Sequence, residues 1–327
     1  MAIIGETVAT LGDIAKRLDK DGKIDKIVEM LTQTNEILED MMFMEGNLPT
    51  GHKTTIRTGL PAAAWRLLNY GVPQSKSRTQ QITDTCGMLE AYAEVDKALA
   101  DLNGNTAAFR LSEDRAFMEA MNQEQAKTLF YGDTSKTPER FLGLAPRFST
   151  LNKTKAATAE NIIDAGGTGS NLTSIYLPCW GDQTIFGIYP KGSKAGFQHT
   201  DLGERTLKDA NGGQYQGYRT HYKWDNGLVV KDWRYVVRIA NIDLATITDE
   251  DMIKFMIMAS ERLPDLRMGK PVFYMRKETR TRLRLAKLDK QNVRLTFDNV
   301  EGKKVLAFDE IPVRRCDAIS LTEDKVS

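Results

Sequence analysis

Residues 271–319 read PVFYMRKETRTRLRLAKLDKQNVRLTFDNVEGKKVLAFDEIPVRRCDAI. The apolar start indicates a buried strand, and the spaced arginines and leucines after it indicate a basic amphipathic helix. A polar excursion then leads to a second apolar run, which indicates a returning strand. The stretch holds no recognisable catalytic group, so this unit favours a surface that packs against copies of itself.

Composition is that of a soluble globular protein, because 41% of the 327 residues are hydrophobic and 27% are charged. No apolar run approaches the roughly 18 residues of a membrane span. The N-terminus lacks a basic region followed by an apolar one, so we expect no secretion signal. The net charge of 45 − 44 = +1 argues against dedicated nucleic-acid binding, which usually needs a clear basic excess.

The first 85 residues predict a helical start followed by an extended excursion. Residues 10–44 show helical spacing in two pieces, broken at Asp21-Gly22. They form either an arm that docks on another molecule or the helical start of a globular core. Residues 47–85 hold too little apolar material for a core, so they predict a two-stranded excursion or an irregular segment folded onto its own domain. A free hairpin is marginal in water and would need a neighbour to rest on.

Residues 86–131 are predicted to be the most helical part of the chain. Apolar residues at steps of four and three suggest one helix seam, made of Met88, Tyr92, Val95, Leu99 and Leu102. Ser112 is then the expected N-cap of a second helix that ends at Gly132. The expected buried side of that helix comprises Phe117, Met118, Met121, Leu129 and Phe130.

Strand-like segments dominate residues 174–242. Asp225-Asn226-Gly227 predicts a hairpin turn between two of them, because Asn-Gly tolerates the positive φ of such turns. Thr248 with Asp251 resembles a capping box that opens a helix through Leu263, and Pro264 ends it. The predicted fold class is α+β, with one long helix, a long antiparallel ribbon and the C-terminal strand–helix–strand unit.

No motif supports a catalytic, cofactor or metal site. The candidate ligands and nucleophiles are widely spaced, without HExxH or CxxC: His52, His199, His221, Cys86, Cys179 and Cys316. We expect the cysteines to be buried reduced thiols. Glycines 166, 167 and 169 match neither phosphate-binding pattern and predict a solvated loop.

Two further interpretations of the function remain open, and the first depends on the basic helix. On a helix, Arg280, Arg284 and Lys287 share one face, which is solvated, paired with acidic groups of a neighbouring subunit, or able to bind phosphates. A soluble nucleic-acid-binding protein is therefore one alternative. An enzyme with His199 or His221 in a pocket is another.

Several fragments together give the chain a family resemblance. They are NYGVPQSKSRTQQITD (69–84), EVDKALADL, FMEAMNQEQAKTLFYGD, PERFLGLAPRF, SIYLPCWGDQTIFGIYPKGSKAGF and the closing VFYMRKETRTRLRLAKLD with FDEIPVRRCDAI. Across nearly its whole length the chain resembles tailed-bacteriophage major capsid proteins of the HK97-like fold, in the gp7-like group.

The resemblance implies a division of the chain into functional parts. These are an N-terminal arm (1–46), an extended E-loop (47–85), a P-domain with a spine helix and long strands (86–244), an A-domain (245–320) and a C-terminal tail (321–327). In the usual family order, comparable P-domain strands follow the A-domain unit. Here residues 174–244 precede it, so we expect a different order of connection.

The implied function is structural, without catalysis: hexamers and pentamers forming an icosahedral phage head around double-stranded DNA. Implied partners are further copies of the chain, a separate scaffold protein, a portal, a possible decoration or cement protein, and packaged DNA bound without sequence specificity. The expected location is the virion, after assembly in the cytoplasm of the host bacterium. Candidate inter-subunit contacts are Lys53, Arg57, Trp65, Arg66, Lys76, Arg78, Arg280, Arg284 and Lys287.

Overall fold

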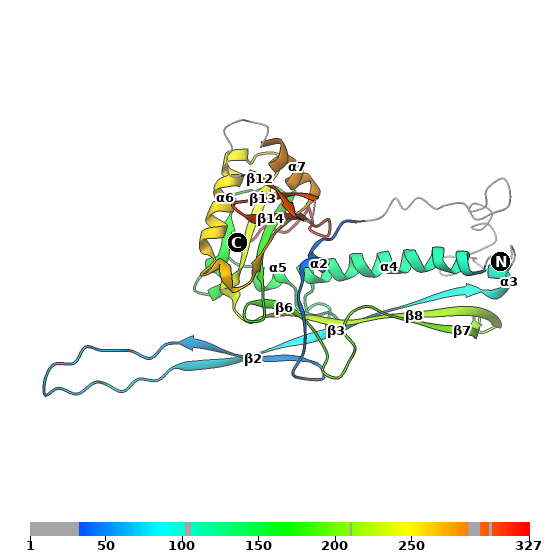
Figure 1. Ribbon diagram of the computed structural model, residues 1–327, viewed down its shortest axis with the longest axis horizontal. Helices are drawn as coiled ribbons and strands as arrows, with labels where there is room; N and C mark the ends of the chain where they lie inside the picture. The colour runs from blue at the N-terminus through cyan, green and yellow to red at the C-terminus, as the bar shows by residue number, and fades with distance from the viewer. Residues whose placement is uncertain (1–32, 102–105, 210, 287–294, 301–302) are drawn as a thin grey trace.

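The computed structural model describes residues 33–101, 106–209, 211–286, 295–300 and 303–327. They form an elongated lower tier, an upper lobe and a protruding hairpin (Figure 1). In the lower tier, helix α4 (Thr106–Tyr131) runs beside a ribbon of strands β3 (Arg78–Asp96), β8 (Gln214–Val230) and β7 (Gln198–Lys208). The hairpin is made of β2 (Gly51–Gly59) and the first part of β3.

One sheet connects all three parts. Over the described residues it has 14 strands, with the main path β12-β13-β14-β11-β5-β6-β8-β3-β2. The remaining strands on this path are β5 (Leu172–Trp180), β6 (Ile185–Tyr189), β11 (Phe273–Met275), β12 (Leu295–Val300), β13 (Lys303–Phe308) and β14 (Ile311–Arg315). Off it lie β7 and four further strands, β1 (Phe43–Glu45), β4 (Ile162–Asp164), β9 (Val236–Asp243) and β10 (Lys270–Pro271). The short helices are α2 (Ile37–Asp40), α3 (Lys97–Asp101), α5 (Leu144–Arg147), η1 (Ala157–Asn161), η2 (Trp233–Tyr235) and η3 (Leu266–Met268).

The predicted strand–helix–strand unit is present in the upper lobe. Strand β11 leads into helix α7 (Lys277–Ala286), and β14 returns parallel to β11. Ile175 of β5 and Ile239 of β9 share one apolar cluster with Met256 of helix α6 (Asp249–Arg262) and Leu283 of α7. The boundary expected between residues 244 and 245 therefore runs through a single core.

Helix α6 begins and ends as its sequence predicts. The Thr248 hydroxyl accepts a hydrogen bond from the backbone N–H of Asp251 at 3.1 Å, and the Asp251 carboxylate accepts the hydroxyl proton at 2.6 Å. The helix ends at Arg262, just before Leu263 and Pro264. These signals are local, which explains why they are readable from the sequence.

The helix predicted from Met88 to Leu102 is wrong over its first part. Residues 78–96 form strand β3, whose partners in β8 run from Gly227, opposite Cys86, to Gly217, opposite Asp96. Met88, expected to be buried, is 72% exposed. The following helix, α4, starts at Thr106, so Ser112 lies inside it, and Met118 is exposed. Pairing with a strand some 130 residues away in sequence overrides the local periodicity.

The turn predicted at Asp225-Asn226-Gly227 is also wrong. Strand β8 runs straight through these residues, with Asn226 opposite Gly87 and Gly227 opposite both Cys86 and Ile188. Glycine is needed at 227 because an added Cβ would lie 2.6 Å from the backbone oxygen of Thr85. Its function is therefore close packing between two neighbouring strands.

The helical start predicted for residues 10–44 is only partly described. Residues 1–32, with the break at Asp21-Gly22, lie outside the described residues. Where the description begins, α2 spans four residues, and Phe43–Glu45 form strand β1, parallel to β6. The expectation of helix through residue 44 is therefore wrong at its end, because β6 provides a parallel partner strand.

Candidate assembly surface

The hairpin predicted within residues 47–85 is an antiparallel ribbon that leaves the body, with one register shift between Arg57 and Gly59. Its register runs from Gly51 opposite Thr85 to Gly59 opposite Arg78. Beyond the strands the chain turns back where the Tyr70 N–H donates to the Leu67 carbonyl at 3.2 Å, with Asn69 at φ 70°. Figure 1 shows this extension projecting well beyond the rest of the molecule.

Large apolar side chains cover the outer part of the hairpin. Their exposed fractions range from 52% to 104%, in the set Leu60, Trp65, Leu67, Leu68, Tyr70 and Val72. Single exposed apolar residues are normal on proteins, whereas six gathered on one segment mark an interaction site. Tryptophan and tyrosine are also the side chains most enriched where binding energy concentrates.

Positive charge accompanies these apolar residues. Five of the predicted contact residues lie here, all exposed: Lys53, Arg57, Arg66, Lys76 and Arg78. Residues 53–83 contain no aspartate or glutamate. Within the described part of the chain none of the five cations forms an ion pair, so this hairpin is a cationic and apolar surface.

One buried ion pair anchors the root of the hairpin. Arg147 Nη2 of α5 lies 2.6 Å from Asp84 Oδ1, and it also donates to the carbonyl of Leu228 at 3.1 Å. Gly51, which lies opposite Thr85, leaves no room for a side chain, because a Cβ there would lie 2.0 Å from the Asp84 backbone oxygen. Burial lowers the pKa of the neighbouring His52, while Asp84 acts in the opposite direction.

The basic helix α7 lies in the upper lobe, far from the hairpin (Figure 1). Arg284 is exposed, whereas Arg280 is half-buried. The pKa of Arg280 is lowered by burial and by the positive charges of Arg284, Arg315 and Arg314, against the effect of Glu36. Lys287 falls outside the described residues. The structure thus separates the predicted contact residues into two groups, one on the hairpin and one on α7.

The main polar cluster joins the two tiers, and sequence reasoning missed it. Arg238 Nη2 of β9 lies 2.8 Å from Glu323 Oε2, and both side chains are about 95% buried. The hydroxyls of Ser174 and Tyr131 also donate to the Glu323 carboxylate. Burial, with Tyr176 and Glu323, raises the pKa of Tyr131. A usable signal was present, because Arg238 interrupts an apolar run and a buried arginine needs a partner.

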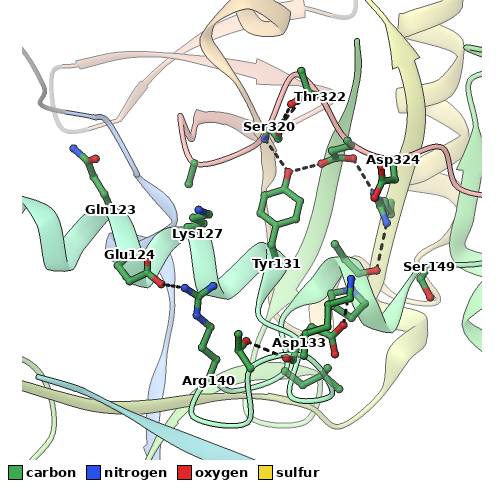
Figure 2. Close-up of a pocket in the computed structure, with 18 of the residues that line it drawn as sticks. Gln123, Glu124, Lys127, Tyr131, Asp133, Arg140, Ser149, Ser320, Thr322 and Asp324 are labelled. Atoms are coloured by element: carbon green, nitrogen blue, oxygen red, sulfur yellow. Dashed lines mark hydrogen bonds and ion pairs between the residues drawn. The ribbon is translucent and has the colours of Figure 1, made fainter. Parts of the chain in front are cut away.

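A groove of about 1280 Å³ lies beside this cluster, between α4, residues 133–149 and the C-terminal segment. Figure 2 shows Tyr131 at its centre, with Lys127 and Arg140 on one side and Asp324 on the other. Arg140 pairs with Glu124 at 2.6 Å. The groove contains a mixture of paired charges and no arrangement of nucleophile and base.

The histidines have structural partners. His221 stacks on Tyr92, with 4.5 Å between ring centroids, and its Nε2 lies 3.2 Å from Glu90. His199 packs near Tyr222. Among the described residues no group of three potential ligands could hold a metal ion. Within the same residues no helix is long and apolar enough to cross a membrane.

Comparison with known proteins identifies similar chains. A family model described as Major capsid protein GP7 matches residues 19–327. A chain in the structure of bacteriophage Epsilon15 is 38% identical, with a TM-score of 0.79, over 100% of this chain and 99% of that one. The bacteriophage JBD30 capsid is similar in fold, at 10% identity and a TM-score of 0.50, over 89% of this chain and 93% of that one. A comparison with curated proteins finds no match.

Proposed function

The chain belongs to the Major capsid protein GP7 family, and we propose that it forms a phage head by assembling as hexamers and pentamers into an icosahedral shell. As a major capsid protein of a tailed phage, it has a structural function and a place in the virion. The shell would enclose double-stranded DNA and contact it without sequence specificity.

The hairpin is the observation that carries this proposal. It exposes six large apolar side chains and five cations that form no ion pair with any residue the structure describes, and its buried side chains Thr54 and Asp84 lie near its root. Apolar burial contributes about 25 cal/mol per Å², so a neighbour that covers this surface is strongly favoured. We assign the hairpin as the E-loop, resting on a second copy of the chain through Trp65 and its neighbours.

The other parts are assigned by the same reasoning. Residues 1–46 are the N-terminal arm and residues 47–85 the E-loop. The lower tier of α4, β3, β7 and β8 is the P-domain. Residues 245–320, together with β4, β5 and β9 that share their core, form the A-domain. Residues 321–327 are a tail that joins the tiers through Glu323.

Further partners follow from a shell that has to be built, filled and closed. We expect a separate scaffold protein, a portal at one vertex and possible decoration by a cement protein, with assembly in the cytoplasm of the host bacterium. Among the described residues neither Lys53 nor Lys76 forms an ion pair with an acidic side chain, so we predict no covalent link between subunits through these lysines. Boiling shells in detergent decides this: a ladder of bands indicates linkage and a monomer band excludes it.

Removing the hairpin tip tests the assignment. Purified chain should form uniform hollow particles by size-exclusion chromatography and negative-stain microscopy. A variant with residues 60–77 replaced by a short turn should remain a folded subunit by circular dichroism and form no particles. Normal shells from this variant would refute the E-loop assignment, and a wild-type chain without particles would refute the shell function.

A tip substitution provides the matched control. Trp65→Ala removes the most exposed aromatic side chain and should reduce shell yield sharply, because such side chains dominate interface energies. Met88→Ala alters another exposed apolar residue, 72% exposed, on the body, and we expect it to assemble nearly normally. The alternatives of a DNA-binding monomer or an enzyme gain no specific support from the site.

A further inference from the structure

We propose that upper lobes of neighbouring copies meet head to tail, with the basic flank of α7 on one copy against the acidic flank of α6 on the next. This rests on the proposed shell function and names a contact that would close a capsomer ring. In Figure 1 helix α6 lies along the left side of the lobe and α7 at the lobe's upper right; within one subunit Arg282 of α7 pairs with Asp249 at the start of α6 at 2.7 Å. Contacts between different faces of identical subunits are the kind that generate rings.

The α7 flank offers positive charge beside exposed apolar surface. Arg284 is exposed and forms no ion pair among the residues described, and Leu285 next to it is 58% exposed. Arg280 lies close by with Arg314 and Arg315. Its Nε atom is buried and has no hydrogen-bond partner among the described residues. Arg314 pairs with Glu36 and Asp40, and Arg315 pairs with Asp317, so in the same part of the chain Arg280 and Arg284 are the members of this cluster without an ion pair.

The α6 flank has the opposite character. Glu250, Met258 and Glu261 are exposed on one face of the helix, and Met258 is 46% exposed. In the described part of the chain neither glutamate forms an ion pair. Beyond the helix, a hollow of about 420 Å³ is lined by apolar residues such as Pro264 and Ile311, by three acidic residues and by one basic residue, Arg267.

On each flank, one charged side chain thus lies beside one exposed apolar side chain. Met258 and Glu261 are three residues apart and adjacent on the helix surface, as Arg284 and Leu285 are adjacent in the chain. Docking the flanks brings Leu285 onto Met258 and the hollow, and Arg284 beside Glu261. Charge pairs at a rim contribute modest affinity but fix register and exclude wrong partners. We therefore infer that the Arg284–Glu261 pair determines how neighbouring copies are aligned with each other in the ring.

A charge reversal with a matched control tests the contact. Arg284→Glu should reduce shell yield about tenfold, because two carboxylates would then face each other across the contact. Adding Glu261→Arg in the same chain should restore the yield to within about twofold. Adding Glu250→Arg changes an equally exposed glutamate about three helical turns away, and should restore nothing.

The outcomes separate this contact from the shell function. Wild-type shells with an unaffected Arg284→Glu variant would refute the contact alone, as would equal rescue by both arginine substitutions. A wild-type chain that forms no particles would refute the shell function itself.

If Arg284→Glu lowers the yield of folded subunit, a cysteine pair decides instead. Leu285→Cys with Met258→Cys should give a ladder of disulfide-linked copies from oxidised shells on a non-reducing gel. Monomer only, from intact shells, would refute the contact.

Discussion

At the scale of single residues, a buried ion pair holds the two tiers together. Arg238 reaches the backbone oxygen of Phe148 at 2.7 Å, as well as the carboxylate of Glu323. Asn241 adds a second tie, because its side chain both donates to and accepts from the backbone of Val326. The last residues of the chain are thus fastened to β9 by side chains distant in sequence.

Glu323→Ala should lower the free energy of unfolding of the free subunit by about 3–5 kcal/mol, because Arg238 would stay buried without its counter-charge. Urea denaturation followed by circular dichroism measures this. Asp324→Ala, an exposed neighbour, should change stability by less than about 0.5 kcal/mol. Equal effects of the two substitutions would contradict the importance of the pair.

A second residue gives the subunit acid sensitivity. Burial would raise the pKa of Asp317, but hydrogen bonds from Arg315 and from the Thr34 N–H lower it below its ordinary value of 3.8. A carboxylate with a lowered folded pKa stabilises the protein above its unfolded pKa, and this stability is lost as pH falls through the folded value. The contact between Thr34 and Asp317, just after β14, is therefore weakened by acid.

The variant Asp317→Asn tests the direction of this pH dependence of stability. It should destabilise the subunit at pH about 6, and its deficit relative to wild type should shrink as pH falls towards about 3. Urea denaturation at both pH values measures the two free energies of unfolding. A deficit that grows on acidification would contradict the assigned direction.

At the scale of elements, the sequence predicts a helix or strand correctly where neighbouring residues determine it. The prediction fails where a partner far along the sequence determines the element. The cap at Thr248 and the strand–helix–strand of residues 271–319 depend on neighbouring residues, and both are confirmed. The strand at Met88 and the course of β8 through Asn226-Gly227 depend on partners far along the chain. Local patterns there were compatible with helix and turn, and only tertiary pairing decided otherwise.

In the candidate site, too, some residues could be predicted from the sequence and others only from the fold. Low apolar content and glycine punctuation predicted an excursion at residues 47–85, and cations and Trp65 could be named from composition. The Arg238–Glu323 pair joins residues 85 positions apart, and no spacing rule connects them. The exposed flank of α6 likewise emerges only once the packed faces of the lobe are known.

Two glycines in the hairpin allow a matched test of its root. Gly51→Ala would place a Cβ 2.0 Å from the Asp84 backbone oxygen, whereas at Gly59 the nearest atom would be 3.6 Å away, an ordinary contact. Gly51→Ala should therefore lower both subunit stability and shell yield. Gly59→Ala should leave both nearly unchanged, measured by thermal unfolding and particle counts; the reverse order would contradict the described root.

At the scale of the whole molecule, the net charge is close to zero, but the charged residues are unevenly distributed along the chain. Residues 53–83 carry five basic residues and no acidic ones, although the net charge is only +1. In a shell these cations would be engaged with protein. A container that bound its contents tightly would hinder packing and release, so low net charge suits this function.

Gel-shift assays on the free subunit test this view. We expect only weak, non-specific binding to duplex DNA, with a Kd above about 10 µM at physiological salt. Hairpin variants with Arg57→Gln and Arg66→Gln should weaken it further. Submicromolar affinity that falls steeply with salt would favour a nucleic-acid-binding function instead.

The uninterrupted course of β3 has a mechanical consequence. Its 19 residues belong to the hairpin at one end and to the ribbon beside α4 at the other, with no loop between. A force applied by a neighbour at Trp65 therefore reaches β8 through a ladder of backbone hydrogen bonds. If the hairpin rests on a neighbouring copy as proposed, a displacement of its tip would be transmitted along β3 to the strands beside α4, and the two copies would be mechanically coupled.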